Sequence, residues 1–393
     1  MSKKLTIKIK NKIWPKIGSF FYEQMLNDSS IVRNLNCNGS GNQLRLLISY
    51  KAKGYFVNLE SKVGRTIFSE IFKIVKVFSE LGYCIDVLDC NDVRCLASVK
   101  STKYDAIFGF GEVFYKAVHF NPNSISILYM TENHPDFSLK EETKRIAYFY
   151  NRHRIHAKIE RSGTFYKMHH LDRKYSHVIT LGEVELLMPQ YENPAPIFPT
   201  GIINSDFIFK TKNHELARRN FLWLGSKGAI HKGLDILIDI FSQRDDLILH
   251  VCGLTKEDKK QIGFPKRKNI IDYGHIDIRS QLFLNIADTC TYSILPSCSE
   301  GCATSITTGM LHGLIPIVMR DSGFNRLGNT AFFLEDFKVD YMNSKLTEIA
   351  NTDIASLIQL SETAFDFARK NFVLSAFEEN FRIIINAFLA NND

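Results

Sequence analysis

Two short segments of the sequence combine charged side chains with glycine-rich backbone. The first is Gly225-Ser226-Lys227-Gly228-Ala229-Ile230-His231-Lys232-Gly233, which lies between an apolar run and an amphipathic one. In a strand-loop-helix passage of this kind, backbone amides and the helix N-terminus face an incoming anion. Lys227 and Lys232 can add positive charge, so the segment predicts a diphosphate site. The alternative interpretation is that both lysines are ordinary solvated side chains at a helix start.

The second segment, 296–316, carries one carboxylate in a loop of small residues. An apolar strand leads into Glu300, and a short helix capped by Thr304 or Ser305 follows and ends at Gly313. Glu300 is therefore expected at a strand end beside free backbone amides. A carboxylate there can accept hydrogen bonds from sugar hydroxyls, as a sugar site requires. Glu300 could instead cap the neighbouring helix.

The sequence pattern of the N-terminal half predicts one doubly wound α/β domain. Its helix, expected over 66–81, has a regular apolar stripe and is closed by Gly82. The flanking apolar runs are nearly continuous, as strands of a parallel sheet are. We expect these strands at 44–50, 84–90, 104–111, 124–130 and 177–182.

The pattern restarts after 193–213, which contains Pro194, Pro196, Pro199 and Gly201 and reads as a domain connection. Helices are expected over 233–243 and 365–389. The second set of strands is expected at 221–225, 247–253, 269–274, 291–297 and 314–319. Ligands in such sheets bind at the carboxyl ends of the strands, here in a cleft between the two halves. The predicted domains are 1–200 and 201–375, with 376–393 as a helix returning to the first.

Composition places the chain among globular proteins. Its 393 residues are 45% hydrophobic and 23% charged, and no apolar stretch is long enough to span a bilayer. The start lacks a signal-peptide core, so we expect a cytoplasmic protein. Its eight cysteines show no metal-ligand spacing and no compact framework. We therefore expect free thiols. No aspartate cluster suggests a bound divalent metal, so we expect none.

The net charge of +7 is concentrated in two runs with interleaved aromatic residues. Residues 3–16 hold six lysines and no acid, with Trp14, Phe20 and Phe21 in or near the run. The second run spans 148–174. Its basic residues are Arg152, Arg154, Lys158, Arg161, Lys167, Arg173 and Lys174. Such runs suit an anionic membrane surface or a phosphorylated acceptor, or they form a solvated face. No nucleic-acid-binding motif accompanies them, so nucleic acid is not an expected partner.

The order and separation of these segments resemble family 4 of the GT-B glycosyltransferases. The resemblance rests on Lys232-Gly233, on Tyr273-Gly274-His275-Ile276, and on the segment from Pro296 through Glu300-Gly301 to Gly313 and Pro316. The resemblance is good over residues 221–328, whereas in the N-terminal half only the order of the elements agrees with the family. It implies two Rossmann-like domains facing across a cleft, with a C-terminal helix crossing back to the N-terminal domain.

The resemblance also implies an activity. Relatives are retaining hexosyltransferases that move a sugar from a nucleotide diphosphate sugar, UDP- or GDP-linked, to a hydroxyl of a glycan or lipid-linked acceptor. They serve bacterial polysaccharide synthesis, such as capsule or lipopolysaccharide, without a cofactor or metal. Peripheral attachment to the inner face of the membrane fits that role.

Individual residues match the family's motifs. Lys232 resembles the lysine that contacts the diphosphate, and Glu300 the first of two glutamates, which holds donor-sugar hydroxyls. The backbone of Gly301 to Ser305, Thr304 included, would meet the phosphates. His275 and Ile276 lie at the positions where the backbone of family members runs beside the nucleobase. His134, after an N-terminal strand, matches a family histidine near the donor sugar.

Two positions depart from the family pattern. The second glutamate, which grips the ribose, is replaced by Thr308, and the arginine after Gly225 is replaced by Ser226, with Lys227 as a substitute charge. These departures leave two other hypotheses open. One is a nucleotide-sugar epimerase, which would use acidic or histidine side chains such as Glu300 and His134. The other is a non-catalytic partner subunit that binds no nucleotide.

Overall fold

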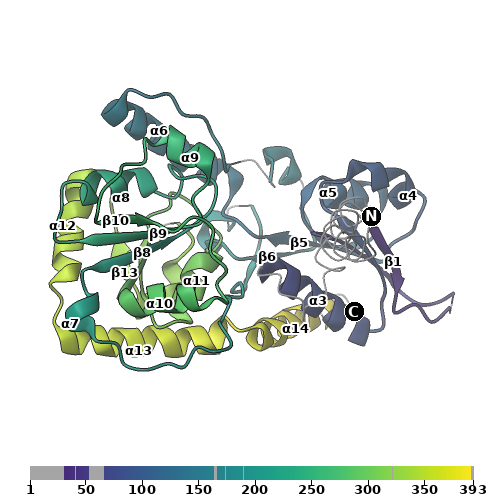
Figure 1. Ribbon diagram of the computed structural model, residues 1–393. Coiled ribbons are helices and arrows are strands. Elements are labelled where there is room, and N and C mark those ends of the chain that lie inside the picture. The colour runs from purple at the N-terminus through teal and green to yellow at the C-terminus, as the bar shows by residue number, and fades with distance from the viewer. Residues whose placement is uncertain are drawn as a thin grey trace, which may run out of the picture. The chain divides into compact units, whose positions relative to one another are not determined.

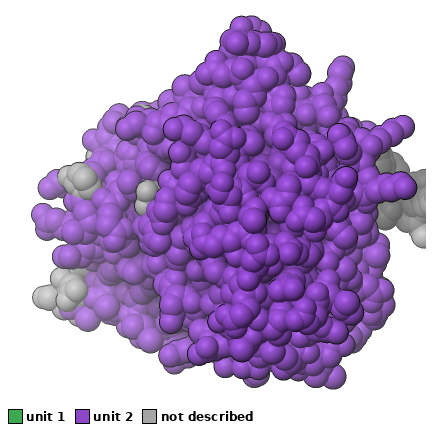
Figure 2. Space-filling model, turned by 90° about the vertical axis from the view of Figure 1, so that its left-hand side faces the viewer, with its two compact units in different colours: residues 1–63, 67–127 green, residues 64–66, 128–393 purple. Residues whose placement is uncertain are grey.

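A computed structural model describes residues 31–39, 41–52, 66–162, 166–172, 174–188, 190–320 and 322–390 (Figure 1). The chain divides into two compact units, with the boundary between Ile127 and Leu128. The face shown in Figure 2 belongs to the second unit. Among the described residues no helix is both long and apolar enough to cross a membrane.

The first unit is built on parallel strands with one antiparallel strand at the edge. Strand β2 pairs in parallel with β3 and β4, and β1 pairs with β3 in the opposite direction. The strands are β1 (Ile31–Leu35), β2 (Arg45–Tyr50), β3 (Cys84–Asp89) and β4 (Ala106–Gly109). The helices are α3 (Thr66–Glu80), α4 (Leu96–Lys100) and α5 (Gly111–Phe120). Helix α3 buries Ile71, Ile74, Val75 and Phe78, the stripe expected from its 3.6-residue period.

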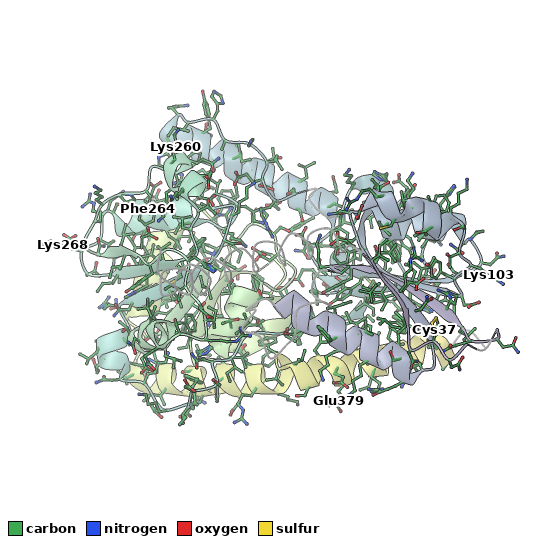
Figure 3. The ribbon with its side chains drawn as sticks, turned by 45° about the vertical axis from the view of Figure 1, so that its right-hand side comes forward. Cys37, Lys103, Lys260, Phe264, Lys268 and Glu379 are labelled. Atoms are coloured by element: carbon green, nitrogen blue, oxygen red, sulfur yellow. A yellow bond between two sulfur atoms is a disulfide. The ribbon has the colours of Figure 1, made fainter. Side chains whose placement is uncertain are left out.

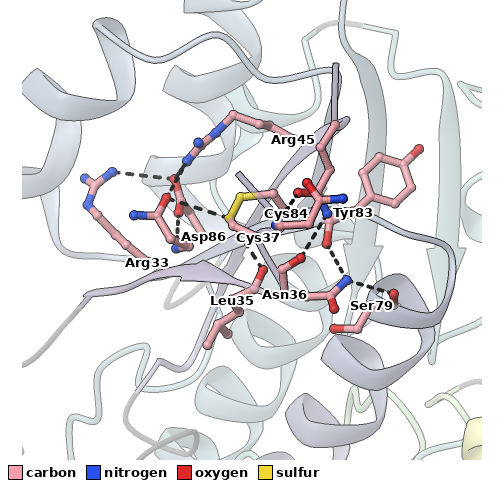
Figure 4. The surroundings of a disulfide bond; sticks show 12 residues. Arg33, Leu35, Asn36, Cys37, Arg45, Ser79, Tyr83, Cys84 and Asp86 are labelled. Carbon is pink, nitrogen blue, oxygen red and sulfur yellow. Dashed lines mark hydrogen bonds and ion pairs between the residues drawn. A yellow bond between two sulfur atoms is a disulfide. The ribbon is translucent and has the colours of Figure 1, made fainter. Parts of the chain in front are cut away.

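A disulfide joins Cys37 to Cys84 in this unit, which corrects the expectation of free thiols throughout (Figure 4). Cys37 follows β1 and Cys84 begins β3, so the bond fastens the antiparallel edge strand to its neighbour. Beside it the buried carboxylate of Asp86 accepts a hydrogen bond from Arg45 and pairs with Arg33. The other six cysteines are free and buried.

The first sheet has the strand order β1-β3-β2-β4-β5-β6-β7. Its last three strands are β5 (Ile125–Met130), β6 (His177–Thr180) and β7 (Ala195–Pro196). Without the antiparallel edge strand β1, the order is that of a doubly wound sheet whose direction of winding reverses between β2 and β4.

The second sheet is parallel throughout and lies in the second unit. Its order is β10-β9-β8-β11-β12-β13, which is the 3-2-1-4-5-6 order of the Rossmann fold. The strands are β8 (Asn220–Leu224), β9 (Ile248–Cys252), β10 (Ile270–Asp272), β11 (Tyr292–Leu295), β12 (Ile315–Met319) and β13 (Phe332–Leu334). Alternate side chains face opposite layers: Phe221 contacts Phe241 of α8, whereas Leu222 packs in the cluster with Phe283 of α10.

Helices cover both faces of the second sheet (Figure 1). They are α7 (His214–Ala217), α8 (Leu234–Phe241), α9 (Lys256–Gln261), α10 (Gln281–Thr289), α11 (Thr304–Met310), α12 (Val339–Ala350) and α13 (Ile354–Asn371). A further helix, α6 (Pro135–His153), follows β5 and was not anticipated from the sequence. Its Phe149 lies in the same apolar core as Trp223 and Leu237 of the second sheet and α8.

The single helix expected over 365–389 is two helices. Helix α13 ends at Asn371, and α14 (Leu374–Ala390) begins three residues later. The break lies at Phe372. Its buried ring contacts Phe198, and its carbonyl accepts a hydrogen bond from Gly201 N. Near the end of α14, the ring of Phe388 stacks on His177 of β6 at 4.1 Å. The last helix thus returns to a strand of the first sheet.

The change from the first sheet to the second falls between Pro196 and Asn220. The compact units, by contrast, divide at Ile127, because β6, β7 and α6 group with the second sheet's residues. The sequence boundaries at 200 and 375 remain predictions.

The disulfide allows a direct stability test. Because it closes a loop of 47 residues, the chain-entropy model assigns it about 4 kcal/mol of unfolding free energy. We expect a reductant to lower the midpoint of urea unfolding of the wild-type protein. Cys37→Ser should lower it by a similar amount and should then be insensitive to reductant. A reductant effect that persists in Cys37→Ser would contradict the assignment.

Candidate functional site

Lys232 and Glu300, the two charged residues singled out in the sequence, meet in the second unit. Lys232 Nζ lies 2.6 Å from Glu300 Oε1, and Ser297 Oγ donates to the same oxygen at 2.6 Å. Lys232 is on the loop after β8 and Glu300 is on the loop after β11. Strands β8 and β11 are neighbours at the point where the winding of the sheet reverses, which is the usual ligand position in this fold.

Both side chains are buried, so their charges compensate each other. Lys232 is 6% exposed and Glu300 is 7% exposed. Burial alone raises the pKa of Glu300, but the charges of Lys232 and His231 lower it to about 2. Glu300 is therefore ionised at neutral pH. Its carboxylate is engaged by a lysine and a serine and does not cap the following helix α11, whose N-terminus has no side-chain capping bond. That it accepts sugar hydroxyls remains a prediction.

The loop that carries Glu300 is held by close backbone contacts. Glu300 N donates to Ser322 O at 2.6 Å, and Gly323, with φ of +106°, approaches the Glu300 carbonyl more closely than a side chain permits. A Cβ on Gly301 would overlap the carbonyl of Thr131. The loop after β11 is thereby fitted against the loop after β5.

His231, adjacent to Lys232, forms a second buried charged group. Its Nδ1 lies 3.4 Å from Glu142 Oε2 and 3.3 Å from Cys298 Sγ, and its Nε2 lies 2.7 Å from Ser299 O. Burial by itself lowers the pKa of His231, but Cys298 and the hydrogen bond with Glu142 raise it to about 10. His231 is therefore held as an imidazolium.

Glu142 projects from α6 and completes this group. Its two oxygens also accept hydrogen bonds from the backbone N–H groups of Glu160, Arg161 and Ser162, at 2.8, 3.1 and 2.7 Å. Burial opposes ionisation, but His231 and these donors hold the pKa of Glu142 well below its usual range. One carboxylate thus ties α6, the segment after it and the loop after β8 together.

Two arginines attach the rest of α6 to the second sheet. Arg145 Nη2 donates to Pro296 O at 2.7 Å, and its guanidinium lies over the ring of Phe337 at 4.6 Å. Arg152 pairs with Asp235 and Asp239 of α8. The helix therefore lies against the loops that carry the sequence-predicted site.

A small polar pocket of about 10 Å³, room for about one water molecule, opens beside Glu300. Its lining residues are Glu132, Ser138, Arg161, Ser162, His231, Ser299 and Glu300. The hydroxyls of Ser138 and Ser299 bond each other at 2.8 Å, and Arg161 Nη2 lies 3.6 Å from Glu132 Oε1. Ser162 Oγ is buried and has no hydrogen-bond partner among the described residues. The carboxylates, cations and hydroxyls of the pocket can all hydrogen-bond to a polar group that enters it.

Glu132 was not selected from the sequence, although it lies two residues from His134. The loop that carries it is fixed by Tyr166, whose hydroxyl donates to Tyr129 O and accepts from Thr131 N, both at 2.8 Å. Burial and the charge of Glu300 raise the pKa of Glu132, while Arg161 opposes the shift. His134 instead begins α6, where its Nδ1 accepts from Asp136 N, and it does not line the pocket.

The loop after β8 differs from the phosphate cradle that its glycines suggested. The amides of Gly228 and Ala229 both donate to Asp258 Oδ1 at 3.1 Å, so an internal carboxylate of α9 already occupies them. Ser226 and Lys227 are exposed, and Gly225 N donates to Cys252 O. The side chain of Lys232 is the part of this segment that reaches Glu300.

The remaining predicted positions are spread along the edge of the second sheet. His275 and Thr304 are exposed, Ser305 is half-buried, and Ile276 is buried in the core cluster with Phe283. Thr308 is buried, and its Oγ1 accepts a hydrogen bond from Ile202 N at 3.0 Å. Where relatives have a ribose-binding glutamate, this chain has a hydroxyl that anchors the segment between the sheets.

The second basic run is not a continuous surface. Arg152 and Arg161 make the ion pairs described above, whereas Arg154, Lys158, Lys167 and Lys174 are exposed. Arg173 and Phe165 lie outside the described residues, as does the whole run over 3–16. The described part of the second run thus combines structural arginines with exposed cations.

No family model and no curated protein sequence matches the chain, but solved structures do. TarM of S. aureus aligns with a TM-score of 0.52 at 14% identity over 75% of this chain and 57% of TarM. HepE of Anabaena, in complex with UDP and glucose, aligns with a TM-score of 0.56 at 13% identity over 88% of this chain and 100% of HepE. The lipopolysaccharide outer core galactosyltransferase WaaB aligns with a TM-score of 0.55 at 12% identity over 88% of this chain and 99% of WaaB.

The chain has the GT-B fold. Two parallel α/β sheets, with the strand orders given above, are what it shares with these glycosyltransferases. The chain spans about 57% of the length of TarM. At these identities the likeness establishes the arrangement of elements and not the activity.

The pair formed by Glu142 and His231 predicts a pH-dependent contribution to stability. Glu142→Gln should lower the free energy of unfolding by about 3–5 kcal/mol near pH 6.5, because it leaves a buried imidazolium without its partner. The pKa of His231 is raised to about 10 in the folded protein, so the pair stabilises fully below the unfolded value near 6.5. Its contribution is lost as the pH rises through about 10, and the difference between wild type and variant should shrink accordingly.

Urea unfolding of both proteins between pH 6.5 and 10 measures this difference. The control is Glu141→Gln, which removes an acid one residue away that pairs with Lys144 at the surface. It should change stability by less than about 1 kcal/mol at every pH. A wild-type-to-Glu142→Gln difference that stays constant across this range would show that His231 is not the titrating partner.

Proposed function

We propose that this protein is a glycosyltransferase that uses a nucleotide diphosphate sugar as donor. The observation that supports the proposal most is the meeting of Lys232 and Glu300 where the winding of the Rossmann sheet reverses, beside a pocket rich in hydroxyl and carboxylate groups. The GT-B fold and the UDP and glucose bound to HepE are consistent with it.

In this proposal the donor replaces an internal ion pair. Without ligand, Lys232 and Glu300 neutralise each other at 2.6 Å. The diphosphate would take over Lys232, and hydroxyls of the sugar would take over the carboxylate of Glu300. Each buried charge then keeps a partner, so neither is left unpaired as the donor enters. A diphosphate that gains negative charge as it departs is stabilised by the same lysine.

The further details come from the resemblance to family 4. We propose transfer of a hexosyl group with retained anomeric configuration and without a metal ion, from a UDP- or GDP-linked donor. The protein would orient donor and acceptor and stabilise the leaving diphosphate. The acceptor would be a glycan or a lipid-linked glycan of bacterial surface polysaccharide synthesis. The contacts of His275, Thr304, Ser305 and the backbone at Gly301 with the nucleotide remain predictions.

A lipid-linked acceptor would place the protein at the surface of a membrane. Exposed cations cluster on α9 and the loop that follows it, where Lys260 and Lys268 flank Phe264 (Figure 3). Lys256, Lys266 and Arg267 of the same segment are also exposed. Such a group of charges attracts anionic lipid headgroups over a distance set by ionic strength.

Replacing Lys232 tests the donor site. We expect Lys232→Met to reduce turnover of the preferred nucleotide sugar by at least about 100-fold, since a charge at the leaving group is worth several kcal/mol in a dry site. Glu300→Gln should lose turnover and still bind the free nucleoside diphosphate. The measurement is release of nucleoside diphosphate across a panel of UDP- and GDP-sugars, with mass spectrometry of the sugar product and EDTA in parallel reactions.

Lys260→Met is the matched control, because Lys260 is an exposed lysine of α9 that does not line the pocket beside Glu300. It should retain wild-type turnover. Circular dichroism of every variant distinguishes a loss of catalytic activity from a loss of folded structure. A free epimerised sugar nucleotide as the product would favour the epimerase, and the absence of stabilisation by any nucleotide in thermal unfolding would favour a non-catalytic subunit.

Flotation with vesicles tests the membrane hypothesis. The wild-type protein should float with phosphatidylglycerol-containing vesicles at low salt and detach at high salt, because the attraction is screened. Lys260→Glu combined with Lys268→Glu should weaken flotation without reducing turnover of a soluble acceptor. Equal flotation with neutral vesicles, or none at low salt, would contradict the hypothesis.

A further inference from the structure

We propose that Cys298 is a reactive thiol that small electrophiles, hydrogen peroxide among them, modify through a cavity beside the candidate site. The proposal is independent of the donor and of the reaction proposed above. It assigns a role to a side chain that the sequence motifs do not use. Three observations support it: the cavity, the charges around the sulfur, and the contrast with the other cysteines.

The cavity lies in the second unit, at the carboxyl ends of β11, β12 and β13. Its volume is about 270 Å³, which is room for several water molecules or for one small reagent. Helix α6 lines it with Phe137 and Arg145, and the loop after β11 lines it with Cys298. The exposed side chains of Lys144 and Arg320 also line it, so the cavity opens to solvent. A reagent that enters this cavity therefore meets Cys298 in its wall.

The sulfur of Cys298 lies beside a positively charged ring. Cys298 Sγ is 3.3 Å from His231 Nδ1, and His231 is held as an imidazolium next to Glu142. The two residues keep this position because Cys298 N donates a hydrogen bond to His231 O at 2.9 Å. A positive charge and an N–H donor beside a cysteine favour its thiolate, which is the nucleophilic form.

Arg145 brings a second positive charge to the same cavity. Its side chain is 2% exposed, and its Nε and Nη1 have no hydrogen-bond partner among the described residues. Burial lowers the pKa of Arg145, and Cys298 is the first of the groups that oppose this shift. A buried guanidinium that is incompletely paired attracts negative charge. Arg145 therefore favours a thiolate at Cys298 in the same direction as His231.

The acidic residues that line the cavity are each paired with a cation. Glu141 pairs with Lys144 at 2.6 Å, Glu335 with Arg320 at 2.7 Å, and Asp336 with Lys338 at 3.5 Å. These pairs are neutral, so they do not cancel the charges of His231 and Arg145 at the sulfur.

The other free cysteines that the structure describes have a different environment. Cys298 is 7% exposed, whereas each of the other five is 3% exposed or less, and none of those five lines the cavity. Burial raises the pKa of Cys90 to about 11 and those of Cys252 and Cys302 to about 12. These three thiols stay protonated at neutral pH and are unreactive. Cys302 lies only four residues after Cys298, so it is an internal control.

The reaction with hydrogen peroxide is a two-electron oxidation of the sulfur. The thiolate attacks one peroxide oxygen and forms an S–O bond, while the O–O bond breaks. The other oxygen leaves as hydroxide, which takes a proton from the solvent and becomes water. The sulfur loses the two electrons that the peroxide gains, and the product is a sulfenic acid.

Alkylation with iodoacetamide at pH 7 tests the reactivity. The full-length wild-type protein is treated without reductant, so that the Cys37–Cys84 disulfide stays intact, and peptides are quantified by mass spectrometry. We expect Cys298 to react at least about tenfold faster than Cys302, and at least about threefold faster than Cys298 in the urea-unfolded chain. Cys298→Ser should abolish this fast alkylation, and the matched control Cys302→Ser should retain it.

Hydrogen peroxide followed by dimedone, which traps sulfenic acids, should label the same residue. His231→Asn, shown to be folded by circular dichroism, should slow the alkylation of Cys298 to the rate of the unfolded chain or below. The proposal is overturned if Cys298 reacts more slowly in the native protein than in the unfolded chain, or if dimedone does not label it. Neither result affects the glycosyltransferase proposal, which is tested by donor turnover.

Discussion

The buried pairing of Glu142 with His231 is the interaction on which the arrangement of the candidate site depends. Removing two ions from water is costly, and the cost is offset here by good geometry and by three backbone N–H donors to the carboxylate. The pair holds α6 against the loop that carries Lys232. Through the Ser299 carbonyl it also reaches the loop that carries Glu300. The pocket exists because these three segments are held together.

This arrangement gives the charged residues of the site different tasks. Glu142 and His231 satisfy each other and the surrounding backbone, and they are structural. Lys232 and Glu300 satisfy each other in this structure, and the proposed function would have a donor take over both, because each is the kind of group that binds phosphate or hydroxyls. The amides of Gly228 and Ala229 in the glycine loop donate to Asp258. These two amides are therefore not available to a ligand in this structure, and the proposed donor contacts of this loop fall on the side chain of Lys232.

The sequence was sufficient for ten of the thirteen strands in the described residues and for the principal charged pair, but β1, β7 and β13 were not predicted. Apart from the short β10, the predicted strands of the second sheet are almost unbroken apolar runs, and such runs are a strong signal in a parallel sheet. Lys232 and Glu300 could be placed because each follows a strand that ends at the same edge. Helix α6 could not be found from apolar periodicity, because its buried face includes Ser138, Glu142 and Arg145. Only the proline and acid at its first turn marked its start.

Other features depend on contacts that no local pattern encodes. Cys37 and Cys84 are far apart in sequence and have no characteristic spacing, so their bond follows only from the pairing of β1 with β3. The apolar stripe continues through Phe372, which concealed the break between α13 and α14. Glu132 and Arg161 come from segments on opposite sides of α6, and their meeting depends on a helix that the sequence did not reveal.

The packing of Gly301 against Thr131 has a consequence for protein engineering. A chimera that exchanges the second sheet would join the first sheet of one GT-B parent to the second sheet of another. In this chain, a crossover between these two positions would combine loops that had not been selected to fit at a distance where even a methyl group is excluded. A workable hybrid would inherit the turn after β5 and the turn after β11 from the same parent, even though one belongs to each sheet.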